Sequence, residues 1–367
     1  MKIFFRFLRD NGAWLGFLTL AIVLSVWTGG DFLSPRNLTN LIRQASINGI
    51  LAAGMTLIIL TGGIDLSIGS VVALCGVLLG VAQMRYGLAE LGTTGLMISA
   101  AVAVGAGLLI GSLNGILIAG LRLAPFVITL GMMVVARGLA LIFSDGASIS
   151  PMGESLNNLS SGYFSELTSI VILAMVVFLF VFRLWREKKN FQFLSLLFPL
   201  FAFALFSQSF WRYKGFPNLA LFLMVVIFLV WILLNQSVLG RCIYAIGSNE
   251  KAAYWAGVPI RKVKITVYAL MGGLAGLAAV LLSGRLNGAD PNAGQLFELD
   301  AIAAVVIGGV SLKGGVGTVT GSLIGALTMA TLNNGMDLLG VSSFYQMVFK
   351  GLIIILAVSL DRNQREA

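Results

Sequence analysis

The chain of 367 residues contains no histidine and only two cysteines. Without imidazole it has no histidine metal ligand, no histidine-dependent nucleophilic triad and no histidine proton relay. Cys75 lies inside an apolar run and Cys242 in a distant basic segment, so we expect two free thiols without a redox or metal role. Few groups remain for chemistry, and we expect neither catalytic residues nor a bound metal.

Charge is also scarce, because charged residues make up 11% of the chain and hydrophobic residues 58%. A soluble domain usually carries about a quarter charged residues, and a helix crosses a bilayer with about 20 apolar ones. The uncharged windows are 11–30, 44–64, 66–84, 91–121, 190–211, 215–240, 265–284 and 314–336, with weaker ones at 124–143, 167–182, 299–312 and 344–360. A soluble core helix would explain one window but not all of them. We therefore predict an all-α polytopic membrane protein with ten to twelve transmembrane helices in one domain, 1–367.

Basic residues indicate the topology, since Lys and Arg bias a loop to the cytoplasm. With the N-terminus inside and twelve spans, most of the 24 basic residues fall in inside segments. Both termini are then expected in the cytoplasm. The net charge of +9 fits a surface facing anionic membrane lipid and requires no nucleic-acid partner.

A polar segment at 236–263 is expected on the inside, and it contains signals for a short helix at 249–257. Ser248 or Asn249 can cap this helix, Glu250 falls in its first turn, and Gly257 with Pro259 ends it. The small residues Ala252, Ala253 and Ala256 would let a partner surface approach closely. Docking to a partner is one interpretation, and a solvated connector is the other.

Several segments resemble the permeases of ABC importers. GSNEKAAYWAGV is similar to the N-E-x-A-A-x-x-x-G coupling loop of these permeases, and GGIDLSIGS to a signature of their monosaccharide (ribose/xylose/galactose) branch. Further resemblance covers 32–55, 285–326 and 332–362. Around 155–215 the chain carries extra apolar material, including a pair of spans at 168–211, which makes it most similar to D-xylose permeases. These spans are expected to be peripheral and to contact lipid.

The resemblance implies the other parts of a type II ABC importer in a bacterial inner membrane. A second permease copy would complete the pathway, a cytoplasmic ATPase with nucleotide-binding domains would hold ATP, and a periplasmic binding protein would deliver a monosaccharide, of xylose type. This chain itself lacks G-x-x-x-x-G-K-[ST], and GGVGTVTG at 314–321 lacks its spacing, so no cofactor is expected here. The alternative is a secondary active transporter for a small polar solute, which would normally carry ionisable residues in several spans.

One carboxylate, Asp65, stands in an apolar run next to two glycines. The pair Gly62 and Gly63 predicts a break between two spans, and Ser67 could cap the following helix or contact freed backbone groups. An ionisable residue in a membrane span is a candidate for a pathway function. A structural cap at a helix start is the other interpretation, and it is favoured because a neutral sugar needs no countercharge.

Charged residues also gather in 285–300, a segment expected outside. Arg285 with Asp290 or Glu298 would form an ion pair at the rim, or these side chains would contact the binding protein.

A weak internal echo links 52–66 with 300–312, and 112–139 with 331–352. Transporters are often built from such repeats, although chance similarity among Gly- and Leu-rich spans would also produce it.

Overall fold

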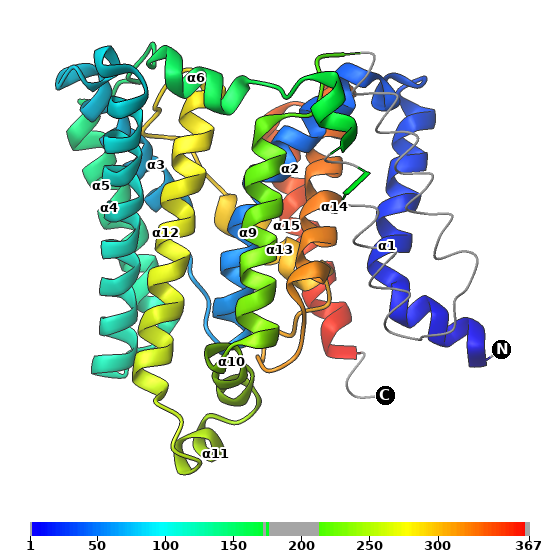
Figure 1. The fold of residues 1–367 in the computed structure, drawn as a ribbon. Coiled ribbons are helices and arrows are strands. Elements are labelled where there is room, and N and C mark those ends of the chain that lie inside the picture. Colours follow the sequence, from blue (N-terminus) through cyan, green and yellow to red (C-terminus); the bar gives the residue numbers. More distant parts are fainter. Residues whose placement is uncertain (1, 172–173, 176–212, 364–367) are drawn as a thin grey trace.

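The computed structural model describes residues 2–171, 174–175 and 213–363, which form helices and irregular segments with no β-strand among them (Figure 1). Most of the expected extra pair of spans at 168–211 lies outside these residues. The helices are α1 (Lys2–Trp27), α2 (Pro35–Leu60), α3 (Ile68–Gly80), α4 (Gly92–Leu121), α5 (Pro125–Ser144), α6 (Glu154–Ser161), α9 (Asn218–Gln236), α10 (Val238–Ser248), α11 (Glu250–Trp255), α12 (Ile260–Leu286), α13 (Phe297–Ile307), α14 (Val319–Leu338) and α15 (Ser343–Asn363).

Six helices of the described part are long and apolar enough to cross a membrane. They are Pro35–Leu60, Ile68–Arg85, Leu88–Leu121, Pro125–Ser144, Asn218–Gln236 and Ile260–Leu286. These helices overlap the expected windows, and the interpretation as an all-α polytopic membrane protein is confirmed.

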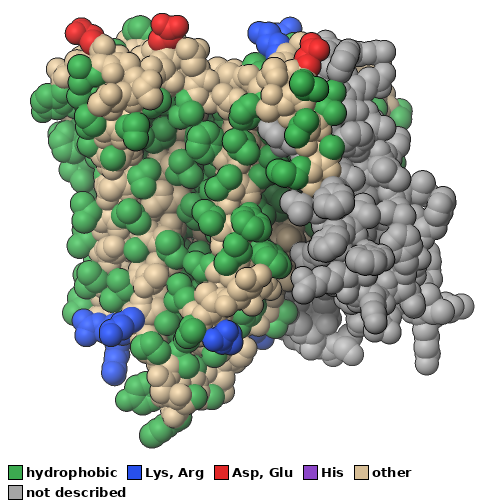
Figure 2. Space-filling view, viewed as in Figure 1, with side chains coloured by type: hydrophobic (Ala, Val, Ile, Leu, Met, Phe, Trp, Pro, Cys, Tyr) green, Lys and Arg blue, Asp and Glu red, His purple; other side chains and the backbone are tan. Residues whose placement is uncertain are grey.

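The bundle has two ends, which we call the α6 end and the α11 end after the short helix lying across each (Figure 1). The first residues of α1 and the last residues of α15 both lie toward the α11 end. Lys and Arg side chains gather at the α11 end of the visible face, whereas Asp and Glu appear at the α6 end, beside one basic group (Figure 2).

The helices α2–α5 and α12–α15 run in opposite directions through the bundle. α2 starts near α6, where Arg43 reaches Ser161, and ends beside Gly247 at the α11 end. α12 starts after α11 and ends near α6, where Gly284 approaches Ser160. In each set the second helix, α3 or α13, is shorter than the others. This order matches the inverted repeats of transporters, and it pairs α4–α5 with α14–α15, as the echo between 112–139 and 331–352 does. The other echo joins α2 to α13, which are not corresponding helices in this arrangement.

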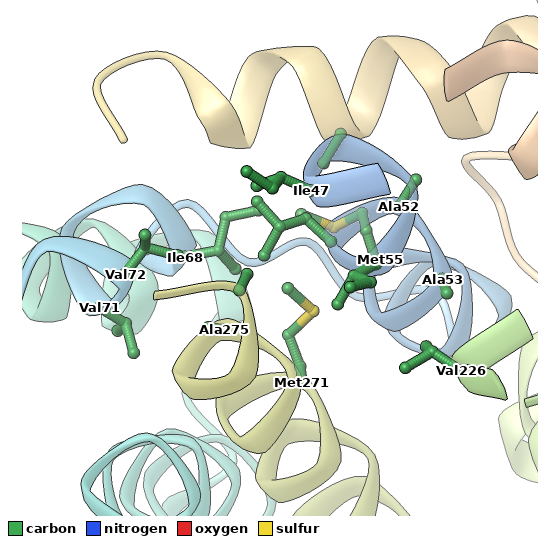
Figure 3. Close-up of a cluster of buried hydrophobic side chains, with 14 of the residues drawn as sticks. Ile47, Ala52, Ala53, Met55, Ile68, Val71, Val72, Val226, Met271 and Ala275 are labelled. Carbon is green, nitrogen blue, oxygen red and sulfur yellow. The ribbon is translucent and has the colours of Figure 1, made fainter. Parts of the chain in front are cut away.

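Close packing around α12 gives the bundle its core. A Cβ added at Gly107 in α4 would overlap the Gly272 carbonyl of α12, so these helices touch backbone to backbone, as small residues allow in lipid. Next to this contact, apolar side chains from α2, α3, α9 and α12 meet, among them Met55, Ile68 and Met271 (Figure 3). This core holds the interrupted helices α3 and α13 in fixed positions.

The segment 236–263 is more ordered than the sequence analysis expected, since α10 precedes α11 inside it. Ser237 caps α10 by accepting a hydrogen bond from the Gly240 N–H at 3.0 Å. Ile243 and Ile246 then bury one face of this helix against the core. The segment expected as a loop with one short helix therefore contains two helices, α10 and α11, before α12 begins.

Candidate functional site

The first interruption follows the end of α2 and includes Gly62 and Gly63, where the sequence analysis expected a break between two spans. Gly62 has a φ of +76°, and the Gly63 N–H returns to the Ile58 carbonyl at 3.1 Å, a glycine-terminated helix end. The chain is then irregular until α3 begins at Ile68. Within this stretch the Ile64 carbonyl accepts a hydrogen bond from the Tyr268 hydroxyl at 3.4 Å, which places the break against the core of α12.

Asp65 is buried in this break and is held by neutral groups. Its Oδ1 accepts hydrogen bonds from the backbone N–H of Ser67 at 2.8 Å and from the Ser67 hydroxyl at 2.6 Å. The same hydroxyl accepts from the Asn114 amide at 3.1 Å. Within the described residues, no Lys or Arg nitrogen lies within 4.0 Å of Asp65 in an ion pair. The Ser67 side chain accepts no hydrogen bond from the first turn of α3, so it does not cap that helix. The Asp65 carboxylate instead fixes the turn that leads into α3, which fits the interpretation of Asp65 as a structural residue.

The second interruption brings the N-terminal end of α13 against that of α3. A Cβ at Gly294 would lie 2.5 Å from the Gly69 carbonyl oxygen, and a Cβ at Gly69 would lie 2.5 Å from the Glu298 carboxylate. Two helix N-termini, each with a partial positive charge, therefore face each other, with the Glu298 carboxylate beside them. Half-helix ends of this kind mark binding positions in transporters.

Two cations from α5 and α15 hold the start of α13. Lys350 of α15 pairs with the Asp300 carboxylate at 3.0 Å, and both side chains are largely buried. Asn333 donates to the same carboxylate oxygen at 3.3 Å. Arg137 of α5 donates to the carbonyls of Pro291 and Ala293, in the segment that leads into α13. The sequence analysis did not identify the partners of Arg137 and Lys350.

Arg285 does not join Asp290 and Glu298, so the predicted rim ion pair is wrong. The two acids lie near Arg137, whereas the Arg285 guanidinium lies 3.5 Å from the Asn40 side chain and close to Arg43. The reason lies in the path of the chain after α12, which ends at Leu286. The following loop passes the C-terminal end of α3, where Ala289 pairs with Ile149, and this carries Asp290 away from Arg285.

Arg285 instead belongs to a group of cations at the α6 end, formed with Arg36, Arg43 and Lys214. Arg43 donates to the Ser161 hydroxyl at 3.0 Å and lies over the Tyr163 ring, but its buried Nε has no hydrogen-bond partner. Beside it lies a cavity of about 540 Å³, and the side chains that line it are mostly polar: Asp31, Ser34, Arg36, Asn37, Thr39, Asn40, Arg43, Tyr163, Tyr213 and Leu338. We call it the outer cationic cavity.

The short helix at the α11 end forms where the sequence indicated, as α11 (Glu250–Trp255). The Asn249 side chain accepts from the Ala252 N–H at 3.0 Å, which is an N-cap. Gly257 terminates the helix with a φ of +80°, and the Val258 N–H returns to the Ala253 carbonyl at 3.0 Å.

The side chains of α11 point in directions that differ in part from the expected docking surface. Ala252 and Ala256 are exposed, whereas Ala253 is only 4% exposed and packs against its own chain. Glu250 accepts hydrogen bonds from Lys264 of α12 at 2.8 and 2.9 Å, so its carboxylate is paired within the chain.

Two aromatic residues that the sequence analysis did not single out dominate the free surface of α11. Tyr254 is 65% exposed and Trp255 is 84% exposed, with their rings in edge contact. The sequence signal that could have identified them was the presence of two adjacent aromatic residues inside a charged segment.

The described residues bring together no group of three or more Cys, Asp or Glu that could hold a metal ion. The polar groups described above instead occur at the two helix breaks, along the outer cationic cavity and on the exposed helix α11.

Comparison with known proteins agrees with this arrangement. Residues 37–358 match the family described as "Branched-chain amino acid transport system / permease component". The chain is 39% identical to the ribose import permease protein of Bacillus subtilis (97% of this chain, 94% of that protein) and 36% identical to the xylose transport system permease protein of Haemophilus influenzae (95% and 96%). It is also 36% identical to the ribose import permease protein of Escherichia coli K12 (98% and 95%). No solved structure matches significantly. The chain therefore belongs to this family of transport permeases, which are membrane transport proteins and not enzymes.

Proposed function

We propose that this chain is the membrane-spanning subunit of an ATP-driven monosaccharide importer in a bacterial inner membrane. A second copy would complete the pathway, an ATPase would bind the α11 end from the cytoplasm and hold the ATP, and a periplasmic sugar-binding protein would dock at the α6 end. The names of the relatives, which are permeases for ribose and xylose, support this proposal.

One observation carries the proposal: α11 presents exposed aromatic side chains and directly follows α10, which contacts the end of α2 and the loop after α13. A groove of about 1030 Å³ runs from Tyr254 and Trp255 to the turn between α4 and α5, at Arg122. Aromatic side chains are the residues that most often anchor a protein interface. An ATPase surface seated here would touch α11 next to α10, which reaches the end of α2 and the loop after α13, and next to the start of α12.

The charges support the same orientation. Arg122, Lys251, Lys262 and Lys313 lie at the α11 end, and basic residues favour the cytoplasmic side of a membrane. We therefore place both termini and α11 in the cytoplasm.

At the opposite end, the outer cationic cavity is suited to an acidic side chain of the binding protein. Arg36 and Arg43 carry more positive charge around this cavity than Asp31 offsets, Arg285 lies close to Arg43, and an arginine pairs strongly with a carboxylate. Asp290 and Glu298, which the sequence analysis grouped with Arg285, remain with α13.

Reconstitution tests the proposal against the alternative, a secondary active transporter. We expect sugar uptake into vesicles only with ATP, a partner ATPase and a binding protein present together. Uptake driven by a proton or sodium gradient without the ATPase would overturn the proposal.

The docking surface is tested by Trp255→Ala, with Phe344→Ala as the matched control. Phe344 is 81% exposed on α15, far from α11. Removing a central aromatic anchor costs about 2 kcal/mol or more of binding, so Trp255→Ala should lower co-purification of the ATPase by at least about tenfold. Equal co-purification of both variants would contradict the assignment.

The transported sugar is proposed to be a pentose of the xylose or ribose type. The identities of 39% and 36% do not separate these two relatives. Competition of each unlabelled pentose, and of a hexose, against radiolabelled xylose would identify the sugar, and failure of both pentoses to compete would contradict the proposal.

A further inference from the structure

The glycine-rich loop between α13 and α14, which contains GGVGTVTG, joins two segments from distant parts of the chain. The Gly315 N–H donates a hydrogen bond to the Leu60 carbonyl, the last residue of α2, at 3.0 Å. The Tyr244 hydroxyl of α10 donates to the Gly317 carbonyl at 2.8 Å. The ends of α2 and α10 and the loop after α13 therefore meet at the α11 end.

The contact between these segments is backbone on backbone and depends on glycine. A Cβ at Gly247 would overlap both the Leu60 carbonyl oxygen and the Gly315 nitrogen. A Cβ at Gly315 would lie 2.6 Å from the nitrogen and the hydroxyl of Ser248, and one at Gly314 would lie 2.9 Å from the Gly247 Cα. Gly314 and Gly315 have φ values of +90° and +72°, but Gly247 is helical, so at Gly247 only the lack of space excludes a side chain.

We propose that this contact, which we call the glycine junction, delivers the displacement of α11 to the ends of α2 and α13. The proposal rests on the proposed function, because it takes α11 as the contact for the ATPase. Only Asn249 separates α10 from α11, so the junction is adjacent to that contact. Close-packed protein groups have low compressibility, and direct backbone contact leaves no flexible side chain to absorb a shift.

The surroundings of the junction leave room for such a movement. A cavity of about 410 Å³ lies between the junction and α12, lined by Thr61, Gly63, Asn249, Lys264 and Tyr268 among others. On its other side α11 is tied to α12 by the ion pair of Glu250 and Lys264. A shift of α11 would thus reach α12 through the short Gly257 turn and the ion pair, and would reach the end of α2 and the loop after α13 through the stiff junction.

Gly247→Ala tests the proposal, with Gly105→Ala in α4 as the control, because a Cβ at Gly105 would meet nothing within 4 Å. We expect Gly247→Ala to keep the ATPase bound and hydrolysing ATP while sugar uptake per ATP falls. Coupling between two sites typically corresponds to about 5- to 150-fold, so a fall of about tenfold is expected. Unchanged uptake per ATP would overturn the proposal. Equal loss of assembly and uptake would show that the junction only maintains the fold, and would also overturn it.

Tyr244→Phe provides a milder second variant, because it removes the hydrogen bond to Gly317 and keeps the ring in place. We expect a smaller loss of uptake per ATP, and a double variant with Gly247→Ala that is less than additive, as for residues acting through one contact. Full additivity would contradict a shared junction. If Trp255→Ala left assembly intact while Gly247→Ala still uncoupled transport, the anchoring role of Trp255 would be wrong and the junction would stand.

Discussion

Each of the two interrupted helices has a buried carboxylate at its start, and the two carboxylates are stabilised in different ways. At the start of α3, Asp65 is held by Ser67 from its own turn, with no cation paired to it among the residues that the structure describes. At the start of α13, Asp300 is held by Lys350, which comes from the last helix of the chain. A buried carboxylate needs hydrogen bonds or a paired charge, and the two breaks use one solution each.

This difference teaches how each break is tied to the rest of the bundle. The Asp65 carboxylate carries its own partner, and its turn is bonded to other helices by neutral groups, among them Asn114 of α4 and Tyr268 of α12. The start of α13 is bonded to cations, Lys350 on α15 and Arg137 on α5, and also to Asn333 on α14. Any displacement of α13 must therefore carry α5 and α15 with it or break those contacts.

Lys350→Met should have the largest effect on stability. It leaves the Asp300 carboxylate buried without its cation, and breaking a buried pair by removing one partner costs about 3–5 kcal/mol. The free energy of unfolding, measured by titrating the purified permease with SDS, reports this loss.

The double variant Lys350→Met with Asp300→Leu is the control, since replacing a whole buried pair by apolar groups is often neutral. Recovery of most of the lost stability would confirm that the cost is an unpaired charge. A double variant as unstable as the single one would show that packing of the Lys350 chain matters instead.

The same substitution at both breaks sharpens the comparison. Asp300→Asn removes the charge that Lys350 pairs with, and hydrogen bonds to charged groups contribute about 1.5–3 kcal/mol. Asp65→Asn keeps an oxygen that accepts from Ser67, so its stability should fall by less than about 1 kcal/mol. Unfolding and ATP-driven uptake would be measured on both. Normal folding of Asp65→Asn with complete loss of uptake would contradict the structural interpretation and favour an ion-coupled transporter.

The sequence was sufficient for features that depend on neighbouring residues. Gly62 and Gly63 predicted a break, and Asn249 with Gly257 predicted a capped helix, because these signals act within one or two turns. The pair of Asp300 and Lys350 was not predicted, because it depends on how α13 packs against α15. Arg285 was grouped with Asp290 and Glu298 by proximity in sequence, as a rim ion pair or a contact with the binding protein, and the direction of the loop after α12 made the ion pair wrong.

The sequence analysis also did not predict the helix α10, and the cause there is different. Arg241 and the glycines Gly240 and Gly247 made the segment resemble a loop, although Ile243 and Ile246 supply an apolar face. Gly247, a poor helix former, is present because of the close approach to Leu60. A requirement of tertiary packing thus obscured the local signal.

Ser67→Ala should have an intermediate effect. It removes the hydroxyl that donates to Asp65 and accepts from Asn114, and leaving a buried polar group unsatisfied costs about 1–3 kcal/mol. Ser112→Ala is the control, because that hydroxyl is exposed and bonds only to the Leu108 carbonyl in its own helix. SDS titration of both variants would reveal the difference, and equal stability would mean that the Asp65 turn does not need the serine.

Arg85→Met should have the smallest effect, although it also removes one partner of an ion pair. Arg85 lies 2.6 Å from Asp145, but the side chains are 49% and 78% exposed, and water solvates whichever charge remains. Exposed pairs contribute about 0–1 kcal/mol, and salt screens them over about 10 Å at 0.1 M. The stability change should therefore be small in low salt and vanish in high salt, whereas the effect of Lys350→Met should persist in both. A loss for Arg85→Met as large as for Lys350→Met would show that burial does not distinguish the two pairs.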